Sequence, residues 1–160
     1  MVTTKRSGAM VLTSSAFAQG KNIPSSFTCD GGDYSPPLGW SGAPSNTRSF
    51  ALVCHDPDAP SGNWYHWAVF DIPAGTTGLA ESLGPRKAPF REAINDFGKR
   101  GYGGPCPPQG HGRHHYHFKL YALDVERLEL EGSVRCREVE RATEAHALAT
   151  AELIGTYSRA

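Results

Sequence analysis

The sequence lacks the features that mark nucleic-acid-binding and membrane-spanning proteins. Its 160 residues include 16 basic and 16 acidic ones, so the chain has no net charge and no global positive field that would attract nucleic acid. Its longest apolar runs are strand-sized, well short of the roughly 20 residues that a membrane-spanning helix needs. We therefore expect no nucleic-acid partner and no integral membrane association.

Cysteine is also scarce and never occurs in a paired motif. The four cysteines, Cys29, Cys54, Cys106 and Cys136, are widely separated and form no Cys-x-x-Cys pair. This argues against a zinc ribbon and against a dense disulfide framework. We expect free thiols, with one or two disulfides only if the protein is exported, and we expect neither a cofactor nor a resident metal ion.

Residues 1–19 resemble a secretory signal only superficially. Lys5 and Arg6 supply positive charge, but Thr13, Ser14 and Ser15 interrupt the apolar stretch that follows. An interrupted stretch is a poor apolar region for a signal peptide. We therefore expect a cytoplasmic location rather than a periplasmic or secreted one.

Glycine and proline divide the first two thirds of the chain into short extended pieces. These pieces are rich in β-branched and aromatic residues and are bounded by turn-forming residues, which is typical of strands. The connection from residue 73 to residue 108 is long for a structureless loop, so we expect it to have a function. The expected strands are residues 10–13, 38–40, 50–55, 64–72 and 114–123.

The last 28 residues differ in character because they contain no proline and a single glycine. From residue 134 to residue 154, small or apolar side chains recur every three or four positions, which predicts an amphipathic helix. Ser133 is the expected N-cap and Gly155 the expected stop. With strands first and a helix last, the sequence predicts one domain over residues 1–160, mainly β and antiparallel, with a C-terminal α-helix.

Two proline-rich segments each lead into a strand that carries histidine. They are Asp-Pro-Asp-Ala-Pro at residues 56–60 and Gly-Gly-Pro-Cys-Pro-Pro at residues 103–108. Proline fixes φ and removes a backbone donor, so such loops hold their shape and can direct neighbouring polar groups at a ligand. We therefore expect the two loops to build one pocket.

The alternation of side chains along the strands indicates which polar groups face this pocket. On the strand at residues 114–123, His114 and Tyr116 share a face with Phe118 and therefore point inward. Asp56 stands at the end of the apolar row of the strand at residues 50–55, which places its carboxylate at the rim of a pocket.

On the strand at residues 64–72, the same alternation places His66 in one row with Trp64, Ala68, Phe70 and Ile72. His66 is then one polar group on a mostly apolar row, although a histidine in such a row can also be a satisfied core residue. In the same way Asp56 can be an ordinary turn residue before proline, and His114 can belong to a solvated edge. The joint arrangement of the three favours a functional site.

The residue types of this set suit a small anion. A carboxylate near an imidazole favours the charged form of the imidazole and fixes its tautomer. A second histidine, a tyrosine hydroxyl and the N–H groups of the glycine loop at residues 101–104 add donors. Such groups would hold phosphate or carboxylate by charge-assisted hydrogen bonds. The leading hypothesis is therefore a non-enzymatic binding module.

Two alternatives use the same residues for other chemistry. Cys106 lies eight residues before His114, and an imidazole such as that of His114 or His66 can activate a thiol, which would suit a thiol or acid-base enzyme of hydrolase type. Metal binding would use Asp56 with the histidines, but histidines on a strand alternate faces, so few of them can share one ion. The candidate metal-binding histidines are His111, His114, His115 and His117.

At these residues the sequence resembles the phosphatidylethanolamine-binding protein family, which includes the Raf kinase inhibitor proteins and their bacterial relatives. The resemblance covers almost the full chain, and the tail at residues 146–157 is similar to the bacterial branch. The family usually has an arginine where this chain has His115, so the ion pair of that arginine is lost or replaced. The motifs that carry the resemblance lie at residues 23–24, 28–31, 35–40, 56–60, 65–67, 95–98, 102–108, 114–116 and 120–124.

The resemblance implies a β-sandwich of two antiparallel sheets with a C-terminal helix. It also implies a small cavity that binds anions such as phosphate, a carboxylate or a phospholipid headgroup. The cavity residues would be Asp56, His66, Cys106, Pro107, His114 and Tyr116.

The resemblance also permits a protein partner, so inhibition of a kinase or protease through surface contacts is a further alternative. Trp40, Trp64 and Tyr65 look exposed in the sequence pattern and are compatible with a homodimer as well as with a core.

Overall fold

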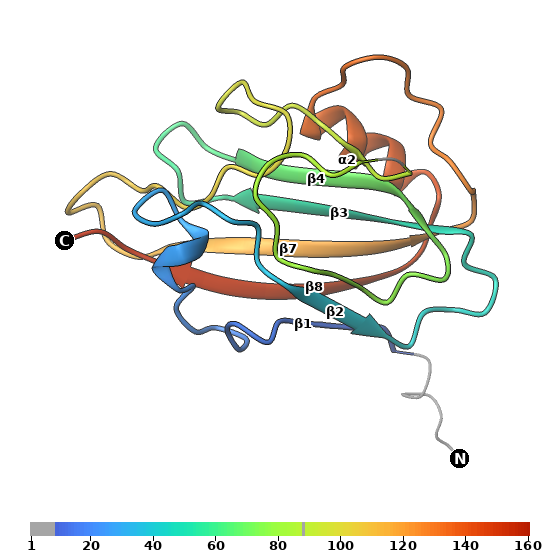
Figure 1. The fold of residues 1–160 in the computed structure, drawn as a ribbon, viewed down its shortest axis with the longest axis horizontal. Coiled ribbons are helices and arrows are strands. Elements are labelled where there is room, and N and C mark those ends of the chain that lie inside the picture. Colours follow the sequence, from blue (N-terminus) through green and yellow to red (C-terminus); the bar gives the residue numbers. More distant parts are fainter. Residues whose placement is uncertain (1–8, 88) are drawn as a thin grey trace.

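The computed structural model describes residues 9–87 and 89–160, which form three layers (Figure 1). A three-stranded sheet, in the order β1-β2-β5, packs on one face of a five-stranded sheet in the order β6-β4-β3-β7-β8, and helix α2 lies on the other face. The elements are β1 (Val11–Thr13), the 3-10 turn η1 (Ser25–Phe27), β2 (Leu38–Ser41), β3 (Ser49–Asp56), β4 (Trp64–Pro73), β5 (Gly78–Leu79), β6 (Arg91–Glu92), β7 (His114–Leu123), α2 (Cys136–Glu144) and β8 (Ala147–Tyr157).

The predicted mainly β, antiparallel sandwich is therefore confirmed. All five predicted strands are present, and their ends differ from the prediction by at most one residue. The named strands pair in antiparallel fashion throughout. Within the described residues, no helix is long and apolar enough to cross a membrane. The charged start of the chain, with Lys5 and Arg6, lies outside the described residues.

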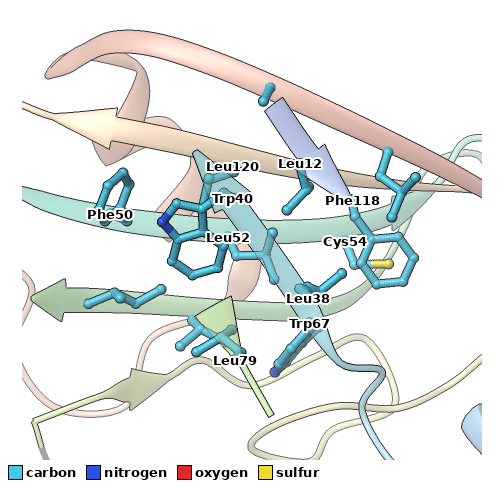
Figure 2. Packing of buried hydrophobic residues seen from close by; sticks show 14 of the residues in the cluster. Leu12, Leu38, Trp40, Phe50, Leu52, Cys54, Trp67, Leu79, Phe118 and Leu120 are labelled. Atoms are coloured by element: carbon cyan, nitrogen blue, oxygen red, sulfur yellow. The ribbon is translucent and has the colours of Figure 1, made fainter. Parts of the chain in front are cut away.

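The main hydrophobic core lies between the two sheets (Figure 2). Each large apolar side chain buried there stabilises the fold by roughly 1.5–3 kcal/mol. The core therefore fixes the small sheet on the large one and sets the position of the strand ends. Its members include Leu12, Leu38, Trp40 and Leu79 from the small sheet and Phe50, Leu52, Cys54, Trp67, Phe118 and Leu120 from the large sheet.

The C-terminal part of the chain contains a shorter helix than predicted. Helix α2 ends at Glu144, and β8 follows as the last element, so the prediction of a helix to residue 154 is wrong. Ala151, Leu153 and Gly155 are buried at every second position, as in a strand. Strand β7 offers this segment a partner along its whole length, and that pairing overrides the helix propensity of its alanines. Gly155 lies inside β8 and stops no helix.

Helix α2 begins after Arg135 and not at the predicted N-cap Ser133. The carboxylate of Glu138 accepts a hydrogen bond of 2.8 Å from the backbone N–H of Arg135, which satisfies one donor of the first turn. The buried Val139 joins a second core with Phe70 on the face of the large sheet away from the small one. The helix thus covers β3 and β4.

Two of the three aromatic residues that were compatible with a homodimer belong to these cores. Trp40 is 7% exposed and Tyr65 is 4% exposed, and the Tyr65 hydroxyl donates to the carboxylate of Glu140. Trp64 is half-buried and lines the cavity described below. These side chains therefore give no support for a homodimer.

A β-bulge at His66 interrupts the alternation along β4. The two neighbours of His66 pair with consecutive residues of β3, so His66 is an extra residue without a partner in the ladder. The predicted row of His66, Ala68 and Phe70 is therefore wrong. Ala68 and Phe70 belong to the core under helix α2, whereas the ring of His66 contacts Tyr116 on the other face. Bulges redirect side chains in this way, often beside functional sites.

One disulfide joins Cys29 to Cys106, with a Cα–Cα distance of 5.4 Å. The expectation of free thiols is wrong for this pair and holds for Cys54 and Cys136, which are buried and unpaired. The N–H of Cys29 donates to the carbonyl of Pro105 at 3.1 Å, so the two segments are in direct contact. The disulfide joins cysteines that are 77 residues apart, and this pairing cannot be read from their spacing in the sequence.

We expect Gly155→Ala to destabilise the fold by roughly 1–3 kcal/mol because it overpacks the core. A Cβ at position 155 would lie 2.6 Å from Cγ1 of Ile23 and 2.7 Å from the ring of Phe17, both of which are buried. Urea unfolding measures the change. The control is Gly75→Ala, where a Cβ meets no atom within 4 Å. Equal stability of the two variants would contradict the packing described for β8.

We expect reduction of the Cys29–Cys106 disulfide to lower the free energy of unfolding by roughly 2–4 kcal/mol, because the bond closes a long loop. Mass spectrometry after alkylation under denaturing conditions should find two labelled cysteines, Cys54 and Cys136, without reductant and four with it. Four labelled cysteines in the unreduced protein would show that the bond does not form.

Candidate functional site

The six predicted site residues all line one cavity of about 310 Å³ at the end of the large sheet where β3 finishes and β4 and β7 begin. The cavity lies between the loop after β3 and the segment before β7, as the two proline-rich motifs predicted. The structure adds six lining residues to the predicted set. The full lining is Asp56, Ala59, Pro60, Ser61, Trp64, His66, Phe97, Cys106, Pro107, Pro108, His114 and Tyr116.

The polar centre of the cavity is a hydrogen bond between Asp56 and His114. Oδ2 of Asp56 accepts from Nδ1 of His114 at 2.6 Å, and the two side chains are 4% and 2% exposed. Because a carboxylate accepts hydrogen bonds, Nδ1 of His114 carries a proton. Oδ1 of Asp56 accepts from the N–H of Asp58 at 2.7 Å, so Asp56 is a turn residue that also lines the cavity.

His111 extends this pair into a chain of three side chains. Its Nδ1 lies 2.7 Å from Nε2 of His114, so the outer nitrogen of His114 is held by an exposed histidine. The sequence placed His111 only among candidate metal ligands and missed this role. Gly110 and Gly112 flank His111 and have φ of +73° and +95°, a left-handed backbone that favours glycine. The Gly-His-Gly run at residues 110–112 is the feature of the sequence that could have indicated the role of His111.

His66 faces the cavity with one ring nitrogen held in place. Its Nδ1 lies 2.6 Å from the carbonyl oxygen of Gly103, and a carbonyl only accepts, so Nδ1 donates. Burial lowers the pKa of His66 below its ordinary value, an effect that the Gly103 carbonyl only partly opposes. His66 is therefore neutral near pH 7, and its Nε2 presents a lone pair.

Tyr116 supplies a hydroxyl at the same point. Its ring lies 5.2 Å from that of His66 and 6.4 Å from that of His114. Burial, together with the nearby carboxylate of Asp56, raises the pKa of Tyr116 far above the ordinary value, so its hydroxyl stays protonated and can donate. Sequence alternation predicted the inward position of His114 and Tyr116 correctly.

Aromatic rings form one wall of the cavity. Phe97 packs edge-on against Trp64 and His66, with ring centroids 5.3 and 5.4 Å apart. The Asn95 side chain holds the turn that carries Phe97, because its Oδ1 accepts from the N–H of Phe97 at 2.9 Å. The turn therefore holds an aromatic ring beside the cavity, and Phe97 remains 43% exposed.

The prediction that N–H groups of the glycine loop add donors to the cavity is wrong for Gly103 and Gly104. The N–H of Gly103 donates to the carbonyl of His66 at 3.0 Å, and the N–H of Gly104 donates to Oδ1 of Asp33 at 2.8 Å. A Cβ on Gly104 would lie 2.4 Å from the carbonyl oxygen of Phe27, so this glycine allows the chain to pack on itself and not on a ligand.

Cys106 is also unavailable as a nucleophile. Its sulfur is bonded to Cys29, so the thiol that an enzyme of this type needs is absent while the disulfide is intact. The hypothesis of a thiol enzyme that uses Cys106 is therefore contradicted for the oxidised protein.

The histidines at positions 114, 115 and 117 each pair with a different carboxylate. Nδ1 of His115 lies 2.8 Å from Oδ2 of Asp58, and Nδ1 of His117 lies 3.0 Å from Oε2 of Glu152. His115 thus pairs with a carboxylate where the family arginine would stand. Among the described residues, no group of three or more histidine, cysteine or acidic side chains is arranged to hold a metal ion.

Comparisons with known proteins agree with this architecture. The model of the family described as phosphatidylethanolamine-binding protein matches residues 13–158. A UPF0098 protein of Aquifex aeolicus is 47% identical over 152 residues, which cover 94% of this chain and 89% of that protein.

Two solved structures are similar over nearly their whole length. Escherichia coli YbcL, described as a new member of the mammalian PEBP family, has a TM-score of 0.89 and 37% identity, covering 94% of this chain and 99% of its own. A putative phosphatidylethanolamine-binding protein homologue of Chlamydia trachomatis has a TM-score of 0.85 and 39% identity, covering 96% of this chain and 99% of its own.

We expect the titration of His66 to lower the free energy of unfolding as the pH decreases. Its pKa is lowered in the folded state, while in the unfolded chain it is near the ordinary value of about 6.5, so below that pH unfolding takes up a proton. The contribution of His66 to the free energy of unfolding is therefore complete above about pH 6.5. It falls as the pH decreases, by at most about 1.4 kcal/mol per pH unit.

His66→Asn should make this fall shallower, because an amide can keep the bond to Gly103 but does not titrate. Urea unfolding at a series of pH values measures the slope. His146→Asn, at an exposed histidine remote from the cavity, is the control and should follow the wild type. An unchanged slope in His66→Asn would contradict a neutral, buried His66.

Proposed function

Because the chain belongs to the phosphatidylethanolamine-binding protein family, we propose that it binds a small anionic ligand in the cavity at Asp56 and His114 without catalysing a reaction. The observation that carries this proposal is the convergence of Asp56, His66, His114 and Tyr116 on one cavity of about 310 Å³. A concave site with apolar walls and a few convergent polar groups is typical of small-molecule binding.

The shape of the cavity favours a ligand with a polar head and a small apolar part. The head would reach the Tyr116 hydroxyl and the two imidazoles at the closed end. The apolar part would lie against Trp64, Phe97 and the prolines at the rim. Phosphate, a carboxylate and a phospholipid headgroup are the ligand classes that we propose.

Binding without catalysis is favoured over a thiol enzyme by the state of the cysteines. Cys106 is the cysteine that lines the cavity, and it is held in a disulfide. The free cysteines, Cys54 and Cys136, are buried in the two cores, and burial raises the pKa of both thiols. A buried thiol with a raised pKa is a poor nucleophile.

Location and protein partners stay predictions. A disulfide persists mainly in oxidising compartments, so the Cys29–Cys106 bond counts against the cytoplasmic location that the N-terminal sequence favours. A kinase or protease partner and a homodimer are likewise proposals that await a direct test.

We expect phosphate to raise the melting temperature in a concentration-dependent way, because a ligand that binds only the folded state stabilises it by mass action. Each kcal/mol gained should raise the melting temperature by about 2–4 °C for a chain of this size. Differential scanning calorimetry at constant ionic strength measures the rise. His114→Ala should abolish it, because the partner of Asp56 is lost.

Tyr116→Phe tests the same site without leaving a buried carboxylate unpaired. Loss of one hydroxyl donor should weaken phosphate binding by roughly fivefold to tenfold while the fold is kept. His146→Ala, at an exposed histidine bonded to Asp124, is the matched control and should respond to phosphate like the wild type. If phosphate does not stabilise the wild type, or stabilises His114→Ala equally, the proposed site is wrong.

A further inference from the structure

The cavity contains hydrogen-bond acceptors that a bare anion cannot satisfy. Asp56 lines it with a carboxylate that is only 3% exposed. Each oxygen of Asp56 accepts one hydrogen bond, from His114 at 2.6 Å and from Asp58 at 2.7 Å. A carboxylate has about four lone-pair sites, so Asp56 retains capacity to accept from a ligand.

His66 adds a second acceptor to the same cavity. Its Nδ1–H is committed to the carbonyl oxygen of Gly103 at 2.6 Å. The proton of the neutral ring is therefore on Nδ1, and Nε2 is left as a lone pair without a hydrogen-bond partner in the described part of the chain. His66 is 3% exposed, so the fixed ring cannot turn its donor toward the cavity without breaking a buried hydrogen bond.

The free donors of the side chains that line the cavity include the hydroxyl of Tyr116 and the buried indole N–H of Trp64, which has no hydrogen-bond partner among the described residues. The hydroxyl of Tyr116 is a clear donor, because the group stays protonated and has no hydrogen-bond partner among the described residues. The outer nitrogen of His114 is shared with Nδ1 of His111 at 2.7 Å. The N–H groups of Gly103 and Gly104 donate to the carbonyl of His66 and to Asp33, so they are not available to a ligand.

We propose that the cavity selects an oxyanion that carries a proton of its own, such as inorganic phosphate or the singly protonated form of a phosphate monoester, over an oxyanion of the same shape without one. The proposal rests on the proposed function and narrows its ligand class. The charged oxygens of the ligand accept from the hydroxyl of Tyr116, while its P–OH group donates to Nε2 of His66 or to Asp56.

Sulfate is the natural comparison because it matches phosphate in shape but has no proton near neutral pH. Bound sulfate would leave the lone pair of His66 without a donor and would place two negative charges beside the buried Asp56 with no hydrogen bond between them. Sites built to hydrogen-bond a hydroxyl strongly reject analogues that lack it, because the buried polar groups of the site are then left unpaired. We expect phosphate to bind at least about tenfold more tightly than sulfate.

The test titrates the full chain with phosphate and with sulfate at about pH 6.5, where roughly a quarter of a phosphate monoester still carries a proton, and at one ionic strength. Backbone NMR shifts of His66, His114 and Tyr116 follow the binding. A second pair, methyl phosphate and dimethyl phosphate, separates monoesters from diesters of the kind found in phospholipids. Tighter binding of phosphate and methyl phosphate supports the proposal. Equal or tighter binding of sulfate and dimethyl phosphate overturns it but leaves anion binding intact, whereas no binding of any of the four overturns the proposed function as well.

A substitution of His66 tests whether this residue causes the preference for phosphate over sulfate. His66→Gln places an amide near the position of Nε2, and an amide can donate as well as accept. The ratio of phosphate to sulfate affinity should therefore fall by at least about threefold, and because both affinities come from the same protein, a partial loss of fold does not imitate this change. His146→Gln is the matched control and should keep the wild-type ratio. An unchanged ratio in His66→Gln would overturn the role given to His66.

Discussion

The hydrogen bond between Asp56 and His114 is the interaction on which the rest of the site depends. Both side chains are almost completely buried, and a buried carboxylate without a partner would cost several kcal/mol. The bond joins the last residue of β3 to the first residue of β7 and fixes the tautomer of His114. Through His114 it also positions His111, so one contact orders a chain of polar groups from the interior to the surface.

A disulfide and a packed core hold the segments that carry this bond. The proline-rich loop at residues 105–108 is held by the disulfide to Cys29, and the core between the two sheets fixes the strands that carry the polar groups. The bulge at His66 brings one more imidazole to the cavity without a break in the core, because Trp67 beside it still packs between the sheets. Rigid walls reduce the entropy lost on binding, which suits a site that discriminates between similar small ligands.

Sequence reasoning predicted the strands and the polar set of the cavity because both depend on local patterns. His114 and Tyr116 follow a regular alternation, and the proline-rich loops mark where the strands end. It missed features that depend on contacts between distant segments. The Cys29–Cys106 bond needs two loops to meet, β8 needs the open edge of β7, and the bulge at His66 needs the register of β3. The hydrogen bonds from the N–H groups of Gly103 and Gly104 to His66 and Asp33 also depend on distant segments and could not be predicted from the sequence.

The most direct test of this account is nitrogen-15 NMR of the histidine ring nitrogens, with and without phosphate. The hydrogen bonds to Gly103 and Asp56 place a proton on Nδ1 of His66 and on Nδ1 of His114, and Nε2 of the neutral His66 is then unprotonated. Added phosphate should then shift Nε2 of His66 and of His114 but leave the exposed His146 unchanged. A proton on Nε2 of His66, or a ring of His114 that does not respond to phosphate, would contradict the account.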